Sequence, residues 1–257
     1  MVSIAKGAYG FAGEVVLVTG SAMGIGAGIA EVLAEAGATV VIADIDAAKA
    51  AQQAARLTAA GHQADAVQLN LADESSIVQA VATVVAKHGS LWGLVNNAGI
   101  QDRQLLLEGT ANEWDRVNAV NSRGVFLITR EVARNMVAAG KGGRIVNIAS
   151  AALIGGLTQG HAVYAASKAA LLGLTRAAAL ELVPHKVTVN TILPGGVATP
   201  GAIAAKGPVP EGPGRRVPPL GLCEPRDIGG AVLFLASPLA RSITNQTFAV
   251  DGGWSVT

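Results

Sequence analysis

The chain has 257 residues, of which 51% are hydrophobic and 14% charged, with 19 basic and 18 acidic side chains. This length is enough for one large globular domain or at most two. The formal net charge is +1 and no run of Lys and Arg is clustered, which argues against nucleic acid and an anionic membrane as partners.

Short β-branched segments alternate with longer Ala- and Leu-rich segments of helical period. Seven predicted strands lie in EVVLVTG from Glu14, TVVIAD from Thr39, AVQLN from Ala66, LWGLVNNAG from Leu91, GRIVNIAS from Gly143, VTVNTILPG from Val187 and TFAVDGG from Thr247. Strands separated by helices are typical of a parallel sheet. Residues 15–18 and 40–43 are continuously apolar, as strands covered on both faces are. We therefore predict an α/β fold: a doubly wound, seven-stranded parallel sheet with helices on both faces, forming a single domain over residues 1–257.

A glycine-rich turn connects the first predicted strand to a predicted helix at residues 27–36. It contains Gly20, Ser21, Met23, Gly24, Ile25 and Gly26. The free N–H groups at a helix N-terminus favour a pyrophosphate, and glycines let the backbone approach it closely. Tight packing of strand against helix is the alternative explanation of these glycines.

An acidic residue, Asp44, ends the second predicted strand about 20 residues after the glycine turn and is followed by Ile45. A carboxylate in this position can accept hydrogen bonds from both hydroxyls of an adenosine ribose, although it could also merely cap the next helix. Because both features lie on one β-α-β unit in the required order, they predict a dinucleotide site.

The same aspartate predicts which dinucleotide is used. A 2′-phosphate beside Asp44 would cost about 4 kcal/mol per charge pair near a surface. Position 23 is Met and position 45 is Ile, so neither offers the Arg or Lys that would pair with a phosphate. We predict NAD(H) as the cofactor, preferred over NADP(H) by about two orders of magnitude or more.

Tyr164 and Lys168 lie four residues apart in a predicted helix at residues 163–182, so their side chains share one face. Acid/base work near neutral pH requires the pKa of a tyrosine to fall by about two to three units, or roughly 3 to 4 kcal/mol. One ammonium about 4 Å away supplies about 4 kcal/mol at an effective dielectric constant near 20. Taken alone, the pair could equally be an exposed helix contact without function.

The order of the motifs decides between these alternatives. The chain contains T-G-x-x-x-G-x-G at 19–26, N-N-A-G at 96–99, Asn121, Ser150 and Y-x-x-x-K at 164–168. In this combination the sequence resembles the short-chain dehydrogenase/reductase family from about residue 11 to 254. The resemblance implies a Rossmann fold and a nicotinamide cofactor.

The resemblance also implies roles for individual residues. Tyr164 would be the acid/base toward the substrate oxygen, and Ser150 would hydrogen-bond that oxygen. Lys168 would lower the pKa of the tyrosine and hold the nicotinamide ribose, while Asn121 would anchor a water in a proton relay or be simply structural. Beyond the glycine turn, Asp44, Ile45, Tyr164 and Lys168, the implied cofactor-binding residues are Asn70, Leu71, Asn97, Val197 and Thr199.

The sequence departs from the family pattern at four places. The segment from Ser150 to Tyr164 is one residue longer than usual, so its loop must bulge. Asn70 stands in place of an aspartate that faces the adenine, and Asn245 replaces a glycine. Half of the ten prolines lie between residues 208 and 219, so residues from about 200 to 222 are interpreted as a lid without regular helix, or as a mobile surface loop.

The remaining expectations concern location and assembly. Cys223 is the single cysteine, and no residues have metal-ligand spacing, so neither a disulfide nor a metal site is expected. The N-terminal residues contain no secretory signal and the longest uncharged stretches are broken by glycines and prolines, which predicts a cytoplasmic protein. By the family resemblance, the helices at 114–138 and 163–182 would assemble a homotetramer. His161 is interpreted as a surface histidine at a helix start, rather than a substrate contact.

Together these features predict an NAD(H)-dependent oxidoreductase that interconverts a secondary alcohol and a ketone. An NADH-linked reductase of a 3-oxoacyl thioester is one alternative, although no basic docking patch for an acyl carrier is evident. A non-catalytic NAD-binding sensor or assembly subunit is the other, although such a module would not need an ionisable phenol beside the cofactor.

Overall fold

A seven-stranded, all-parallel sheet with the order β3-β2-β1-β4-β5-β6-β7 organises the molecule. The structure is a computed structural model that describes residues 9–200, 203 and 205–256. The strands are β1 Val15–Thr19, β2 Thr39–Asp44, β3 Ala64–Gln68, β4 Gly93–Asn96, β5 Gly143–Ile148, β6 Val187–Pro194 and β7 Thr247–Val250. The predicted sheet is confirmed, with β3 starting two residues earlier than expected.

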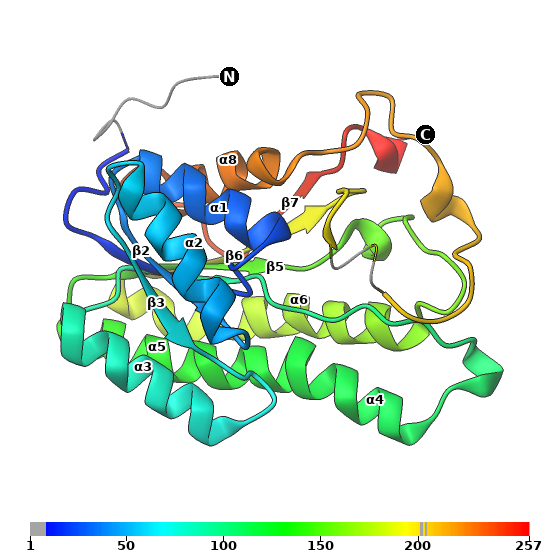
Figure 1. The fold of residues 1–257 in the computed structure, drawn as a ribbon, viewed down its shortest axis with the longest axis horizontal. Helices are drawn as coiled ribbons and strands as arrows, with labels where there is room; N and C mark the ends of the chain where they lie inside the picture. Colours follow the sequence, from blue (N-terminus) through cyan, green and yellow to red (C-terminus); the bar gives the residue numbers. More distant parts are fainter. Residues whose placement is uncertain (1–8, 201–202, 204, 257) are drawn as a thin grey trace.

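Helices cover both faces of this sheet (Figure 1). The helices α1 Gly24–Glu35, α2 Ala47–Ala59 and α8 Pro225–Ala236 pack on one face, and α3 Glu74–His88, α5 Val125–Ala139 and α6 Ala162–Leu182 pack on the other. Strand β1 shows how the sequence builds two cores. Its residues Val16 and Val18 enter the first core, whereas Val15 and Leu17 enter the second, because successive side chains of a strand point to opposite faces.

The helical segment before β5 is longer and less regular than the sequence predicts. Instead of one helix at 114–138, it consists of α4 Ala111–Asn118, a π-helical stretch Ala119–Gly124 and α5. The π-helical stretch contains Asn121, whose side chain is completely buried. Wide turns of this kind are rare in helices and often occur at functional sites.

The proline-rich segment runs beside the carboxyl ends of the strands without a regular helix over residues 205–222, apart from one 3-10 turn at Pro213–Arg215. Three residues of the predicted lid, 201, 202 and 204, lie outside the described residues. Pro200 and Ile203 are helical, and the N–H of Ile203 donates to the carbonyl oxygen of Thr199 at 3.1 Å, so the start of the lid differs from the prediction of no regular helix. Further along, Asn245 has φ +56°, a left-handed conformation that asparagine tolerates better than most residues. This explains how it can stand in place of the family's glycine.

No helix within residues 9–200, 203 and 205–256 is long and apolar enough to cross a membrane.

Candidate active site

A cleft of about 630 Å³ lies at the carboxyl ends of the strands. Most of the predicted site residues line it. These are Gly20, Met23, Gly24, Ile25, Asp44, Ile45, Asn70, Leu71, Asn97, Ser150, Tyr164, Lys168, Val197 and Thr199. In open α/β sheets, ligands bind at this edge, where the strand order reverses. In this sheet the reversal falls between β1 and β4.

Three predicted residues lie behind the cleft instead of in it. Ser21 is fully buried, and its hydroxyl donates to the carbonyl oxygen of Val18 at 2.7 Å. Gly26 has no room for a side chain, because a Cβ there would lie 2.3 Å from the carbonyl oxygen of Gly20. Asn121 is also fully buried. These residues shape the site without lining it.

The glycine turn presents the N-terminus of α1 to the cleft. Gly20 and Gly24 have φ values of +62° and +59°, which glycine adopts without strain. The N-cap residue, Met23, makes no side-chain hydrogen bond to the helix, whereas the N-cap residues of α2, α3 and α4 all do. The first N–H groups of α1 are thus without a side-chain cap, as an anion site at a helix N-terminus requires.

A polar brace holds this turn against the N-N-A-G motif. The Thr19 hydroxyl accepts the backbone N–H groups of Asn97 and Ala98 at 3.0 and 3.1 Å. In return, the Asn97 side chain donates to the carbonyl oxygens of Thr19 and Gly20, both at 3.0 Å. Asn97 therefore fixes the turn as well as lining the cleft.

Asp44 lies at the end of β2, whereas Tyr164 lies in α6, which follows β5. Strands β1 and β4 lie between β2 and β5 in the sheet. The Asp44 carboxylate accepts the N–H groups of Ala22 at 3.1 Å and Asp46 at 3.2 Å, which fixes its orientation. Sequence reasoning missed one nearby cation: Lys49, on the first turn of α2, interacts electrostatically with Asp44. Lys49 is exposed and forms an ion pair of 2.9 Å with Asp46, so it is already engaged by another carboxylate.

The structure brings Ser150, Tyr164 and Lys168 together at the other end of the cleft. Ser150 follows β5, and its hydroxyl accepts the N–H of Ala152 at 3.1 Å. Tyr164 and Lys168 lie in the first turns of α6, with 9% and 4% of their surfaces exposed. The Lys168 ammonium donates to the carbonyl oxygen of Ile148 at 2.8 Å.

Burial shifts the two ionisable groups of α6 in opposite directions. It raises the pKa of the Tyr164 phenol, an effect that its hydrogen bond with Ser150 partly offsets. It lowers the pKa of the Lys168 ammonium to about 8. Desolvation disfavours whichever form is charged. The phenol is therefore neutral near pH 7, while the lysine still carries its proton there.

Asn121 connects the residue after the N-N-A-G motif to Ser167, the neighbour of Lys168 in α6. Its side-chain oxygen accepts the N–H of Ile100 at 2.9 Å, and its amide donates to the Ile100 carbonyl at 2.8 Å and to the Ser167 hydroxyl at 3.0 Å. Between Asn121 and Lys168 lies Gly99, where a Cβ would come within 3.1 Å of the ammonium nitrogen. Gly99 also lines the cleft. It was not among the predicted site residues, although it belongs to the N-N-A-G motif that identified Asn97.

His161 is closer to the catalytic group than the sequence suggests. It precedes α6, is only partly exposed, and its ring centroid lies 5.3 Å from that of Tyr164. Its ring nitrogen Nδ1 lies 3.0 Å from the Thr158 hydroxyl. Burial, with a smaller contribution from Arg103, lowers the pKa of this histidine. His161 thus lies at the start of α6, as predicted, and is partly buried beside Tyr164.

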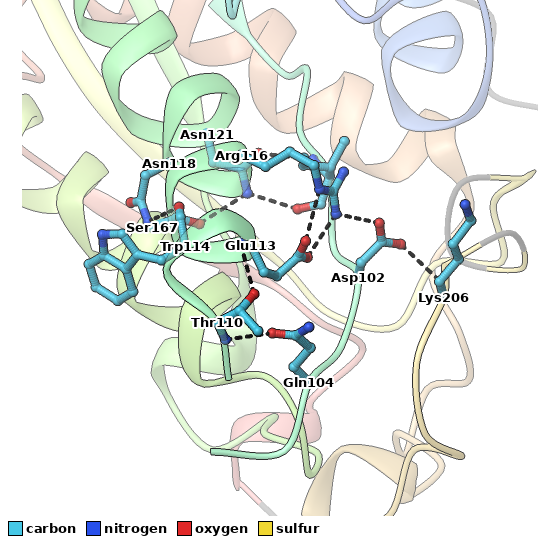
Figure 2. A network of polar contacts seen from close by, with 11 residues as sticks. Asp102, Gln104, Thr110, Glu113, Trp114, Arg116, Asn118, Asn121, Ser167 and Lys206 are labelled. Atoms are coloured by element: carbon cyan, nitrogen blue, oxygen red, sulfur yellow. Dashed lines mark hydrogen bonds and ion pairs between the residues drawn. The ribbon is translucent and has the colours of Figure 1, made fainter. Parts of the chain in front are cut away.

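Two side chains that sequence reasoning missed anchor the proline-rich segment beside the cleft. Asp102 accepts the backbone N–H of Lys206 at 2.8 Å and also binds Arg116 of α4 (Figure 2). The neighbouring Arg103 donates to the carbonyl oxygens of Ala205 and Pro208, at 3.3 and 3.0 Å. No short motif signals this arrangement, because the partners are about a hundred residues apart.

A doubly wound sheet with a glycine turn, a strand-end carboxylate and a buried Tyr-Lys pair in one cleft defines a dinucleotide-dependent oxidoreductase. Comparison with known proteins agrees. A family model described as enoyl-(acyl carrier protein) reductase matches residues 20–255. The chain belongs to the short-chain dehydrogenase/reductase family.

The relatives indicate the range of activities in this part of the family. A sorbitol dehydrogenase of Cereibacter sphaeroides is 39% identical, over 94% of this chain and 97% of its own. The 2,5-dichloro-2,5-cyclohexadiene-1,4-diol dehydrogenase LinX of Sphingobium indicum is 40% identical, over 95% and 97%. The crystal structure of 3-ketoacyl-(acyl-carrier-protein) reductase from Brucella melitensis complexed with NADH has a TM-score of 0.86 at 36% identity, over 95% and 99%.

Proposed function

We propose that this protein is an NAD(H)-dependent oxidoreductase that interconverts a secondary alcohol and a ketone. The observation that carries the proposal is the single cleft that joins the glycine turn and Asp44 to Ser150, Tyr164 and Lys168.

The residues fit a nicotinamide dinucleotide. The uncapped N-terminus of α1 suits the pyrophosphate. The adjacent Gly20 lets the turn pack against the N-N-A-G motif, since a Cβ there would lie 2.7 Å from the Cα of Ala98. Asp44 and Ile45 would hold the adenosine ribose, with Asn70 and Leu71 beside the adenine. Asn97 and Lys168 would hold the nicotinamide ribose, and Val197 and Thr199 the carboxamide. When bound, the nicotinamide supplies or accepts the hydride.

Tyr164 is the acid/base in this proposal. In ketone reduction, the neutral phenol donates its proton to the substrate oxygen, and Ser150 donates a hydrogen bond to that oxygen. In alcohol oxidation the proton returns to the phenolate. The Lys168 ammonium, which shares a face of α6 with Tyr164, would steady that phenolate electrostatically, and the hydrogen bond with Ser150 opposes the effect of burial on the pKa of Tyr164. Asn121 holds the backbone at Ile100 beside Lys168 and would anchor a water that carries the proton out.

The choice of NAD(H) is supported by the charges at the adenosine end. Asp44 would repel a 2′-phosphate. Lys49 acts on Asp44 from the first turn of α2, but it is paired with Asp46. Two carboxylates and one ammonium would therefore lie near a 2′-phosphate, and their net negative charge would repel it. This supports the preference for NAD(H).

A 3-oxoacyl thioester is the second candidate substrate, because the Brucella melitensis reductase that resembles this chain carries that name and is complexed with NADH. The names of the sorbitol and LinX dehydrogenases support polyols and cyclic diols instead. We favour the alcohols, since His161, whose ring centroid lies 5.3 Å from that of Tyr164, would offer a hydrogen-bonding side chain next to the acid/base.

The experiment that tests the proposal is a turnover assay with NAD+ or NADP+ over polyols, cyclic diols, hydroxysteroids and simple secondary alcohols, with acetoacetyl-CoA and NADH as the thioester arm. We expect turnover of at least one alcohol class with NAD+. Turnover of acetoacetyl-CoA alone would select the second candidate. Tight NADH binding without turnover of any compound would contradict both and favour a cofactor-binding sensor.

A further inference from the structure

A second cleft, of about 490 Å³, lies at the amino ends of β5 and β6, the edge of the sheet opposite the candidate active site. Its lining includes Lys141, Arg144, Lys186 and Arg241. None of the residues that line it is acidic. Within the described ranges, none of the four cations belongs to an ion pair. Glu14 interacts electrostatically with one of them, Lys141.

Arg144 forms the floor of this cleft and is only 5% exposed. Its guanidinium lies 4.7 Å from the centre of the Trp92 ring. It donates to the carbonyl oxygens of Gly143 at 2.8 Å, Ser237 at 3.3 Å and Lys186 at 3.4 Å, but to no carboxylate in the described part of the chain. A buried charge without a counter-ion is costly. An anion in the cleft would supply the missing charge.

A second, independent observation points to a ligand at the same place. Thr188 is the direct partner of Arg144 in the pairing of β5 with β6, so the two side chains are neighbours on one face. Thr188 lines the cleft and is 5% exposed, and its hydroxyl oxygen has no hydrogen-bond partner among the described residues. Buried hydroxyls are nearly always hydrogen-bonded.

We propose that this cleft binds the phosphate group of a small molecule, with Arg144 and Thr188 at its floor and Lys141, Lys186 and Arg241 at its rim. A phosphate offers several acceptor oxygens to these donors at once. The cleft is of the size of a small-molecule site. The chain's net charge of +1 argues for such a ligand over a nucleic acid, which would need an extended basic surface.

The test is calorimetric titration of inorganic phosphate into the NADH-saturated protein, at an ionic strength held constant with chloride. Saturation with NADH is needed because the N-terminus of α1 is itself a potential phosphate site. We expect one saturable site. Arg241→Gln and Lys186→Gln each remove one exposed rim charge and should weaken binding at least fivefold.

Lys87→Gln is the matched control. It removes the same charge from an exposed lysine that pairs with Asp65 on β3, four strands away from β5 in the sheet. We expect this variant to bind phosphate as the unmodified protein does. Equal weakening in all three variants would show only a general charge effect and would overturn the proposal, as would the absence of saturable binding.

Thr188→Val separates a ligand-binding role from a structural one. Valine keeps the branched shape but has no hydroxyl, so the folded protein loses no hydrogen bond. We expect an unchanged or higher melting temperature without phosphate, and phosphate binding weakened about fivefold. Unchanged phosphate affinity would contradict the assignment of the threonine. If this variant does not fold, the two rim variants still decide the proposal.

Discussion

At the scale of single residues, Asp44 carries the cofactor preference. Asp44→Asn keeps the shape and one acceptor oxygen, but removes the charge that would repel a 2′-phosphate. Hydrogen bonds to charged groups contribute about 1.5 to 3 kcal/mol. We therefore expect kcat/KM with NAD+ to fall about tenfold and kcat/KM with NADP+ to rise at least tenfold.

Asp73→Asn is the control for this prediction. Asp73 caps α3 through the N–H of Ser75, but it does not line the cleft. Its amide variant should change the ratio of kcat/KM for the two cofactors by less than about threefold. The same loss of discrimination in both variants would show that the overall charge matters and that the position of Asp44 does not.

Lys168 makes stability depend on pH. The folded-state pKa is about 8, whereas the unfolded value is 10.5. Below about pH 8 the lysine is charged in both states, and the cost of burying that charge is fully present. Between about pH 8 and pH 10.5 the lysine is mostly neutral in the folded protein but still charged in the unfolded chain, so the free energy of unfolding rises with pH.

Lys168→Met removes the titrating group, so the difference in stability between the unmodified protein and this variant reports the contribution of Lys168. From about pH 7 to about pH 10, we expect the free energy of unfolding of the unmodified protein to rise by about 2 to 3 kcal/mol relative to the variant. Urea denaturation of both proteins across this range measures the difference. A difference that stays constant with pH would mean that the lysine is not desolvated as the structure indicates.

Sequence reasoning identified most of the cleft because its residues belong to short motifs with fixed spacing. It did not foresee that Ser21, Gly26 and Asn121 lie behind the cleft, since depth in a fold is not encoded in spacing. Lys49 was missed because it acts on Asp44 from the next helix, five residues further along the chain.

At the scale of elements, the crossing of α1 and α8 depends on glycines in close contact. A Cβ at Gly229 of α8 would lie 2.8 Å from the Val32 side chain and 3.0 Å from the Gly28 carbonyl oxygen. A Cβ at the adjacent Gly230 would meet nothing within 4 Å. The two positions therefore respond oppositely to an added methyl group.

Gly229→Ala should lower the free energy of unfolding by about 2 kcal/mol, because the helices must separate to admit the methyl group. Gly230→Ala should raise it by about 0.5 to 1 kcal/mol through helix propensity. Thermal or urea denaturation of the two variants checks both signs. Equal effects would contradict the close approach of α1 and α8.

The strands were predictable because local apolar runs decide where they form. The start of β3 was not, since Ala64 and Asp65 at the sheet edge are only partly buried and lack that signal. The π-helical stretch around Asn121 and the anchoring of residues 205–208 by Asp102 and Arg103 depend on contacts between distant segments, which composition and periodicity do not reveal.

At the scale of the whole molecule, we propose a single domain that assembles as a homotetramer. One sheet runs from Val15 to Val250, with a core on each face. Large apolar side chains remain exposed on the helices of the second face: Trp114 is 48%, Phe126 50% and Leu180 79% exposed. Exposed apolar side chains of this size are typical of protein interfaces.

Light scattering during gel filtration tests the assembly. We expect four times the 25.8 kDa mass of the chain for the unmodified protein. Phe126→Glu should yield a smaller species, because it places a charge within the proposed contact. A monomer at micromolar concentration would contradict the tetramer.

The central claim is that Tyr164 transfers the proton while the rest of the cleft holds the cofactor. The most direct measurement compares kcat/KM of Tyr164→Phe with that of the unmodified protein on its best alcohol, together with the Kd for NADH of each. The variant lacks only a hydroxyl, so we predict kcat/KM lower by about a thousandfold or more with NADH binding within about threefold. A variant that retains more than about a tenth of the activity would contradict the account.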